Sequence, residues 1–474
     1  TGTLNTIVGG EAGKAVTTGD QNTLIGALAG DALTVGRRNS VLGHVALTTD
    51  TAGSLSTAVG FGALNAQNFT TATDSKNTAV GALAGAAMTT GILNTFIGYE
   101  AGDAMTDADG NTAVGANALT TDTMGLNSTA VGITALHNQN FTTATQASNT
   151  AVGAAAGYSI TTGVRNVIMG HLTGDNMTTG SDSTFVGYEA GGAVTTGVEN
   201  TLIGGAAGDA LTDADFNVAV GTFALSTDTL GSKSTAVGAA TLNKQNFGTA
   251  TDSFNTAVGF VAGKEVTTGV NNTLLGGLSG DALTDADANT AIGAYSLSAD
   301  TLGSQSVAVG HGTLTHQNFT TATNALNTAV GYVAGNLITT GTENTLIGGL
   351  SGDAITTGIR NVAVGSYALS TNQQGDQSVA VGHGALFTQN PSGNADMNNT
   401  AVGFNAGQAV TTGANNSIIG ASAGIALTSG ANNNLIGGLA GDALTTGHSN
   451  NIMGVSCGTA LTDADYNVAI GQQA

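Results

Sequence analysis

The sequence predicts an all-β fold, a parallel β-solenoid (β-roll) built from coils of 17 and 21 residues, and three observations lead to it. A strand-like phrase, Asn or Ser followed by any residue, two apolar residues and Gly, recurs 27 times in the 474 residues. Its nearly constant spacing is typical of repeat proteins, in which each unit contacts only its neighbours. The side chains are small, with 73 Gly and only 4% aromatic residues, and they cannot fill one large core. We therefore expect residues 1–474 to form one continuous solenoid domain of 27 coils, cut from a longer fibre.

Two coil lengths alternate along the chain. The Gly that ends each phrase follows the previous one after 17 residues, except for five steps of 21 residues. These long steps are 60–81, 132–153, 238–259, 310–331 and 382–403. Three short steps and one long step make a unit of 72 residues. Because the strand phrase is undisturbed in the long coils, their extra residues are expected to bulge outward.

Each phrase is expected to form a strand with two buried faces. The residue before the Gly is Val, Ile, Leu or Met, as at Val8 and Ile25, and the residue before that is also apolar, as at Ile7 and Leu24. Adjacent residues of a strand point to opposite faces of the sheet. One face then packs inside the coil, and the other requires a partner. The sequence therefore predicts self-association, most simply of sister chains around a symmetry axis.

An asparagine ladder is expected at the position four residues before each Gly, where only Asn or Ser occurs. Stacked amides can form hydrogen bonds from coil to coil and fix the register. The ladder positions that we single out are Asn5, Asn22, Asn77, Asn94, Asn272 and Asn467. TTG or TDAD segments between the phrases have the composition of turns.

Several of these phrases resemble a known family. NTAVGALAG (77–85), NTFIGYEAG (94–102) and NTAVGYVAG (327–335) are similar to the head repeats of YadA-like trimeric autotransporter adhesins and to related shaft repeats of phage tail fibres. The resemblance covers essentially the whole chain. It implies a left-handed β-roll, a homotrimer about a common axis, and an extracellular position on a cell or virion surface.

The TDAD turns are candidate calcium sites. Two carboxylates and an amide at alternate positions of DADxN can supply the oxygen ligands that Ca²⁺ prefers. The candidate ligands are Asp107, Asp109, Asp213, Asp215, Asp285, Asp287, Asp463 and Asp465. The alternative, which we favour, is a solvated Asp-rich turn that replaces TTG at equal length.

The long coils share a Gln-Asn-Phe signature, and its phenylalanines are candidates for contact with a target. They are Phe69, Phe141, Phe247 and Phe319, whereas the fifth copy has Pro391. Repeated exposed Phe could bind a glycan or a protein with avidity. Alternatively the ring folds back and plugs the bulge, which we favour because a single Phe in a loop usually finds cover.

Charge and composition narrow the function classes. The formal net charge of −22 opposes binding to nucleic acid. The sequence contains no stretch of 18 consecutive apolar residues, and we therefore expect no membrane insertion by this segment. The segment 454–458 matches GxSxG but has the register of every other coil, and we expect neither catalysis nor a resident cofactor.

The sequence thus predicts a structural, adhesive surface fibre that presents attachment sites to a host-surface glycan or protein. The first alternative is a phage tail-fibre shaft with receptor binding elsewhere in the chain. An ice- or ion-binding solenoid ranks lower, and an enzyme such as a polysaccharide depolymerase ranks last.

Overall fold

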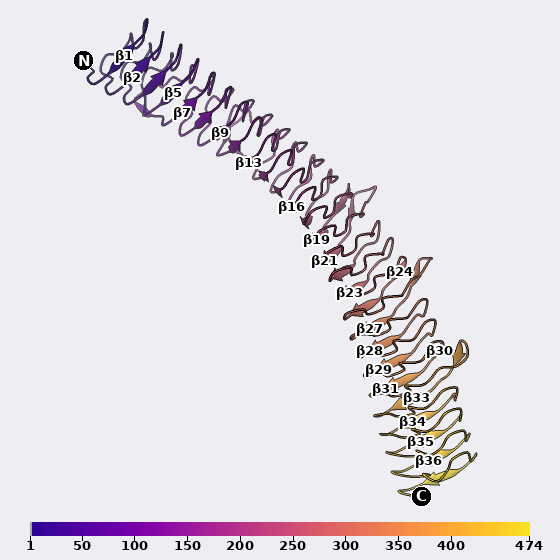
Figure 1. The fold of residues 1–474 in the computed structure, drawn as a ribbon. Helices are drawn as coiled ribbons and strands as arrows, with labels where there is room; N and C mark the ends of the chain where they lie inside the picture. The colour runs from indigo at the N-terminus through magenta and orange to yellow at the C-terminus, as the bar shows by residue number, and fades with distance from the viewer. Residues whose placement is uncertain (1) are drawn as a thin grey trace. The chain divides into compact units, whose positions relative to one another are not determined.

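The computed structural model describes residues 2–474, which form an all-β parallel β-solenoid of about 27 turns (Figure 1). These residues contain no helix, and therefore none that could cross a bilayer. The chain divides into two compact units. The first contains the residues up to Ser234 together with Phe247–Thr251, and the second contains Thr235–Asn246 together with Asp252–Ala474.

Each coil contributes one three-residue strand to a parallel sheet. The first unit contains β1 (Thr6–Val8), β2 (Thr23–Ile25), β3 (Ser40–Leu42), β5 (Thr57–Val59), β7 (Thr78–Val80), β8 (Thr95–Ile97), β9 (Thr112–Val114), β11 (Thr129–Val131), β13 (Thr150–Val152), β14 (Val167–Met169), β15 (Thr184–Val186), β16 (Thr201–Ile203) and β17 (Val218–Val220). The second unit contains β19 (Thr235–Val237), β21 (Thr256–Val258), β22 (Thr273–Leu275), β23 (Thr290–Ile292), β25 (Val307–Val309), β27 (Thr328–Val330), β28 (Thr345–Ile347), β29 (Val362–Val364), β31 (Val379–Val381), β33 (Thr400–Val402), β34 (Ser417–Ile419), β35 (Asn434–Ile436), β36 (Asn451–Met453) and β37 (Val468–Ile470). Neighbouring strands pair in register, so that Leu24 of β2 lies beside Ile7 of β1 and Val41 of β3.

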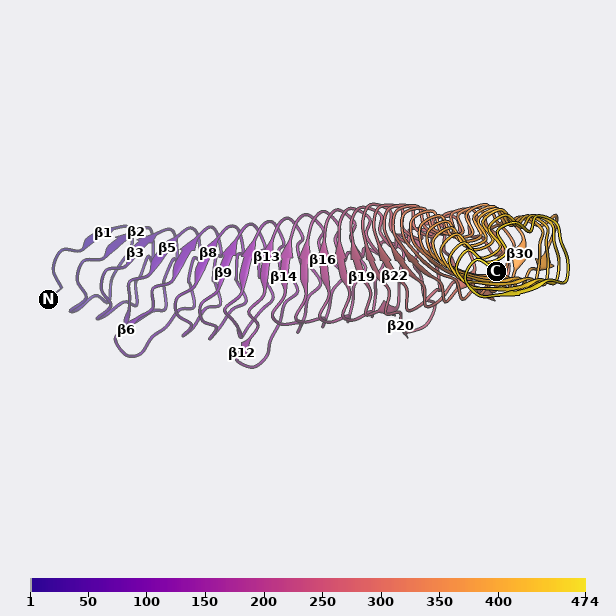
Figure 2. The ribbon, with the colours of Figure 1, turned by 90° about the horizontal axis from the view of Figure 1, so that it is seen from below.

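Two-residue strands accompany the long coils. They are β4 (Gly53–Ser54), β6 (Thr73–Asp74), β10 (Gly125–Leu126), β12 (Thr145–Gln146), β18 (Gly231–Ser232), β20 (Thr251–Asp252), β24 (Gly303–Ser304), β26 (Thr323–Asn324), β30 (Gly375–Asp376) and β32 (Ala395–Asp396). β4 pairs with β6, β10 with β12, β24 with β26 and β30 with β32, always in parallel. Figure 2 shows the loops at β6 and β12 extending beyond the neighbouring coils, as the sequence predicts.

The middle residue of each strand forms the core. From Leu24 of β2 to Ile452 of β36, every middle residue is fully or almost fully buried, and Phe96 and Phe185 are the largest of them. The small residue three positions after the Gly is also buried, as at Ala29 and Cys457. A further apolar row, which includes Leu33 and Met88, and the ladder asparagines are buried beside this column, and the small residues allow the coil to close around it.

A glycine is required at the end of every strand. Gly26 has φ +136°, and a Cβ atom there would lie 2.4 Å from the carbonyl oxygen of Gly43 in the next coil. Both the backbone angle and the close stacking of coils exclude a side chain. The repeat of this Gly in the sequence is thus a direct consequence of the stacking.

Candidate functional site

The predicted asparagine ladder is present in the structure. The backbone N–H of Asn22 donates to Oδ1 of Asn5 at 2.9 Å, and Nδ2 of Asn22 donates to the carbonyl oxygen of Gly36 at 3.0 Å. The backbone N–H groups of Asn94, Asn272 and Asn467 likewise donate to Oδ1 of the Asn in the preceding coil, each at 2.9 Å. Because each side chain joins adjacent coils, the ladder satisfies backbone groups that would otherwise be buried without partners.

In three of the long coils the ladder runs through a buried carboxylate. Nε2 of Gln67 donates to Oδ2 of Asp50 at 2.7 Å and to Oγ of Ser56 at 2.9 Å, and Oε1 of Gln67 accepts from Nδ2 of Asn77 at 2.9 Å. All four residues are buried. The same network joins Asp122, Ser128, Gln139 and Asn149, and again Asp300, Ser306, Gln317 and Asn327.

Burial raises the pKa of the Asp50 carboxyl above its usual value. The hydrogen bonds from Gln67 and from the backbone N–H groups of Phe69 and Gly53 oppose this rise, because they favour the ionised form. Sequence reasoning missed this network. Its signal was that Ser, rather than Asn, stands at the ladder position that opens every long coil, where Gln later fills the space.

The signature phenylalanines, the candidates for target contact, are not exposed in the single chain. Phe69, Phe141, Phe247 and Phe319 are only 5–6% exposed. The backbone N–H of Phe69 donates to Oδ1 of Asp50 at 3.1 Å, which turns its side chain inward against Gly53. The alternative interpretation holds, since each ring plugs the bulge of its own long coil.

In the DADxN turns the three candidate calcium ligands form separate hydrogen bonds. Oδ1 of Asp107 accepts from the hydroxyl of Thr90 at 2.6 Å, and Oδ1 of Asp109 accepts from the N–H of Ile92 at 2.7 Å. Asn111, the expected third ligand, is buried in the ladder and donates to the carbonyl oxygen of Gly125. The amide therefore does not converge with the carboxylates.

The other copies of this turn behave similarly. Asp213 and Asp285 accept from Thr196 and Thr268 of the preceding coil, and Asp215, Asp287 and Asp465 accept from backbone N–H groups, whereas Asp463 accepts from the adjacent Thr462. Within residues 2–474 no group of three or more His, Cys, Asp or Glu side chains has the arrangement of a metal site. The turn carboxylates hold the preceding coil instead.

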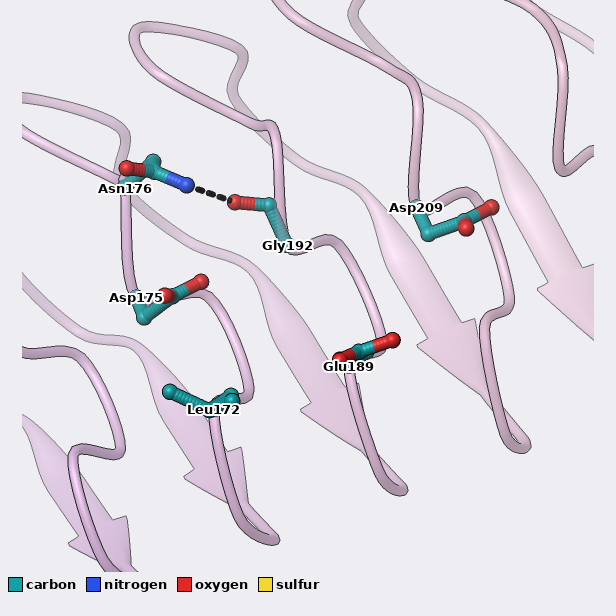
Figure 3. Close-up of a pocket in the computed structure, with 6 residues that line it drawn as sticks. All are labelled: Leu172, Asp175, Asn176, Glu189, Gly192 and Asp209. Atoms are coloured by element: carbon teal, nitrogen blue, oxygen red, sulfur yellow. Dashed lines mark hydrogen bonds between the residues drawn. The ribbon is translucent and has the colours of Figure 1, made fainter.

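An acidic cavity of about 250 Å³ lies on the first unit (Figure 3). Asp175, Glu189 and Asp209 line it from three successive coils, together with Leu172, Asn176 and Gly192. Burial and the charge of Glu189 both raise the pKa of Asp209 and of Asp175. Nδ2 of Asn176 donates to the carbonyl oxygen of Gly192 at 2.7 Å and closes one side. The sequence signal is a Gly-Asp pair five residues after the strand, which we did not single out.

The outward face of the sheet carries an exposed apolar column in each unit. The last residue of every three-residue strand is apolar, and none of these side chains is buried within the chain. Leu42, Val80, Ile97, Met169, Ile203, Val258, Ile292, Ile347, Val402 and Ile419 are 36–49% exposed. We call this column the outer apolar row. No protein-family model matches the chain, and no curated protein matches it significantly.

Proposed function

We propose that the protein is the shaft of a homotrimeric adhesive fibre, which stands on a cell or virion surface and presents attachment sites to a host-surface glycan or protein. The outer apolar row carries this proposal. A monomer leaves one Val, Ile, Leu or Met partly in water in every coil. Three chains that place these rows against a common axis remove them from water.

The free energy gained by burying the outer apolar row favours association of the chains. Covering half of one Val or Ile side chain contributes about 1 kcal/mol. Loss of translational and rotational freedom costs roughly 4–15 kcal/mol per association. A row that repeats in every coil exceeds this cost, whereas a few exposed residues would not. Handedness and the threefold axis are part of the proposal and follow the adhesin resemblance.

The coil structure suits a load-bearing shaft. Adjacent coils are joined by strand hydrogen bonds and by the asparagine ladder, as between Asn5 and Asn22. The formal charge of −22 per chain makes separate fibres repel one another. In this proposal the shaft holds attachment sites at a distance from the surface. A phage tail-fibre shaft, with receptor binding elsewhere in the chain, would have the same mechanical role.

One observation favours a second candidate function, ice binding. The first residue of most strands is Thr, as in β7, β8 and β9, and the strands stack in register. The outward face of the sheet therefore carries a column of Thr beside the outer apolar row, an array able to order water. Ice binding requires the outward face of the sheet to be exposed to water, whereas the proposed trimeric fibre requires this face to be covered by the other chains.

Sedimentation of the purified chain tests the proposal. We expect a particle of three times 46.0 kDa. The triple variant Ile347→Asp, Val402→Asp, Ile419→Asp introduces charge into the outer apolar row and should sediment as a monomer with an unchanged far-ultraviolet spectrum. Leu337→Asp is the matched control, because Leu337 is 42% exposed but lies outside the row. A monomeric wild-type chain that inhibits ice growth would overturn the fibre and support ice binding.

A further inference from the structure

A second exposed row consists of aromatic rings. It occupies the position directly after the Gly that ends each strand, and we call it the ring row. Its aromatic members, Phe61, Tyr99, Tyr188, Phe260, Tyr332 and Phe404, are 52–65% exposed. The fold does not require them, because Ala and Gly occupy the same position in other coils.

In four places a histidine fixes one face of the ring. His171 of the preceding coil stacks on Tyr188 with ring centroids 5.8 Å apart and an interplanar angle of 12°, and His311 stacks on Tyr332 at 5.8 Å and 20°. The pairs His44–Phe61 and His383–Phe404 repeat this arrangement at 5.7 and 5.5 Å. Each ring is thereby held on one face by the coil before it.

For Tyr188 and Tyr332, the other face of the ring adjoins a coil without a side chain in the row. Gly205 follows Tyr188, and Gly349 follows Tyr332. Neither glycine has a positive φ, and a Cβ atom would meet nothing closer than Thr222 Cγ2 or Ser366 Oγ, both at 4.0 Å. These glycines are therefore unlike Gly26, since neither backbone strain nor crowding demands them. The missing side chain leaves a slot beside the ring.

A Thr or Ser side chain closes the far side of each slot. The Cγ2 methyl group of Thr222 borders the slot at Gly205. Oγ of Ser366 borders the slot at Gly349 and donates to the Gly349 carbonyl oxygen at 3.1 Å. Four successive coils thus present His, Tyr, Gly and Thr in the first unit and His, Tyr, Gly and Ser in the second. Because parallel strands are about 4.8 Å apart, the tyrosine and the Thr or Ser are separated by about two spacings, enough for one flat ring between them.

We propose that the slots beside Tyr188 and Tyr332 each bind one pyranose ring of an uncharged glycan. The C–H face of a sugar packs on the open face of the tyrosine. At the Gly349 slot Oγ of Ser366 accepts a hydrogen bond from a sugar hydroxyl, whereas at the Gly205 slot the Thr222 methyl group packs against the sugar. The formal charge of −22 opposes acidic sugars. This inference rests on the proposed adhesive function and names its site and ligand class.

Ligand-observed NMR on the intact protein tests the inference. The probes are methyl glucoside, methyl galactoside and N-acetylglucosamine, with N-acetylneuraminic acid as the acidic counterpart. Saturation should transfer to ring C–H protons of at least one neutral probe. The double variant Gly205→Asn, Gly349→Asn fills both slots without backbone strain and should bind about tenfold more weakly, as should Tyr188→Ala, Tyr332→Ala.

Gly438→Asn is the matched control. Gly438 has the same place in its coil and equally open surroundings, with its nearest atom at 3.9 Å, but Ala421 rather than a ring precedes it. This variant should bind like the wild type. Unchanged binding by the slot-filling variant, or binding of the acidic probe alone, overturns the inference. So does a change of sedimenting mass in the tyrosine variant, which would assign the rings to a contact between chains. A trimer that binds no neutral probe refutes the slots and leaves the fibre standing.

Discussion

Gln67 donates a 2.7 Å hydrogen bond to the buried carboxylate of Asp50, one coil earlier, and so carries the polar ladder across the widest part of a long coil. The fifth long coil provides a natural comparison. There Asn372 replaces the Asp and bonds to the backbone of Gly375, while Gln389 still donates to Ser378. The amide is therefore the constant member of the network, and the carboxylate is exchangeable.

Removing this amide is expected to destabilise the protein. Gln67→Ala leaves Asp50 with fewer donors and removes one of the two acceptors of Asn77 Nδ2, which costs about 1–3 kcal/mol. Asp50→Asn should cost less, since Asn372 occupies the equivalent place. Thermal unfolding followed by circular dichroism compares the two variants, and a larger loss in Asp50→Asn would contradict this account.

Mild acid is expected to stabilise the protein. Burial raises the pKa of Asp50, Asp353 and Asp376 in the folded chain. Between the unfolded value and the raised folded value, the folded state binds more protons than the unfolded state, so stability falls as pH rises through the folded pKa. The unfolding temperature should therefore increase as the pH decreases from 7 to about 5.

Two surface carboxylates have the opposite effect on the pH dependence of stability. Hydrogen bonds from Arg165 and Lys244 lower the pKa of Asp182 and Glu265, and the stability they contribute is lost in acid. Both pairs are on the surface, where ion pairs contribute little. A steady decrease in unfolding temperature from pH 7 to 5 would show that such surface pairs dominate.

Removing one amide from the asparagine ladder should destabilise the coils next to it. Asn272→Ala removes the bonds to Asn255 and to the Ala286 carbonyl oxygen, at an expected cost of about 1–3 kcal/mol. Asn272→Ser should be milder, because Ser183 stands at the same position in an ordinary short coil. Hydrogen exchange should report faster exchange in β21, β22 and β23 for Asn272→Ala; equal exchange in both variants would speak against the ladder as a source of stability.

The two kinds of phenylalanine should respond differently to truncation. Phe69→Ala empties a buried site and is expected to cost about 3 kcal/mol. Phe61→Ala, on the exposed ring row, should leave the unfolding temperature within one degree or so of wild type. Limited proteolysis at the loop before β6 gives a second measurement, with cleavage expected only in Phe69→Ala. Equal effects of the two substitutions would refute the assignment of Phe69 as a plug.

Substitution of glycine by alanine should have different effects on stability at the strand ends and on the ring row. Gly98→Ala forces a Cβ atom to 2.4 Å from the Gly115 carbonyl oxygen at φ +142°, and misfolding or a large loss of stability is expected. Gly349→Ala has ordinary φ and open space, and it should fold normally. Soluble yield and the unfolding temperature decide between them, and a well-folded Gly98→Ala protein would refute the stacking requirement.

The sequence was sufficient for features that every coil repeats. The strand, its terminal Gly and the ladder Asn occupy fixed positions, because each is required by contact with an identical coil above and below. The direction of Phe69 was open, since one loop offers no periodicity to show which side chain turns inward. The Asp50–Gln67 bond joins residues of two different coil types, and only the folded geometry brings them together. Calcium was the less favoured interpretation of the DADxN turns, and the ladder bond of Asn111 to Gly125, which directs its amide away from Asp107 and Asp109, could not be read from the motif alone.

The second unit contains two copies of one aromatic cluster with almost identical geometry. Tyr295 meets His311, and Tyr367 meets His383, both at 5.8 Å and 69°, although the pairs are 72 residues apart. A segment of that length can therefore be duplicated or deleted by unequal recombination while the junctions keep their register. Evolution can adjust the reach of such a molecule, and the number of its glycan slots, in genetic steps that create no new fold.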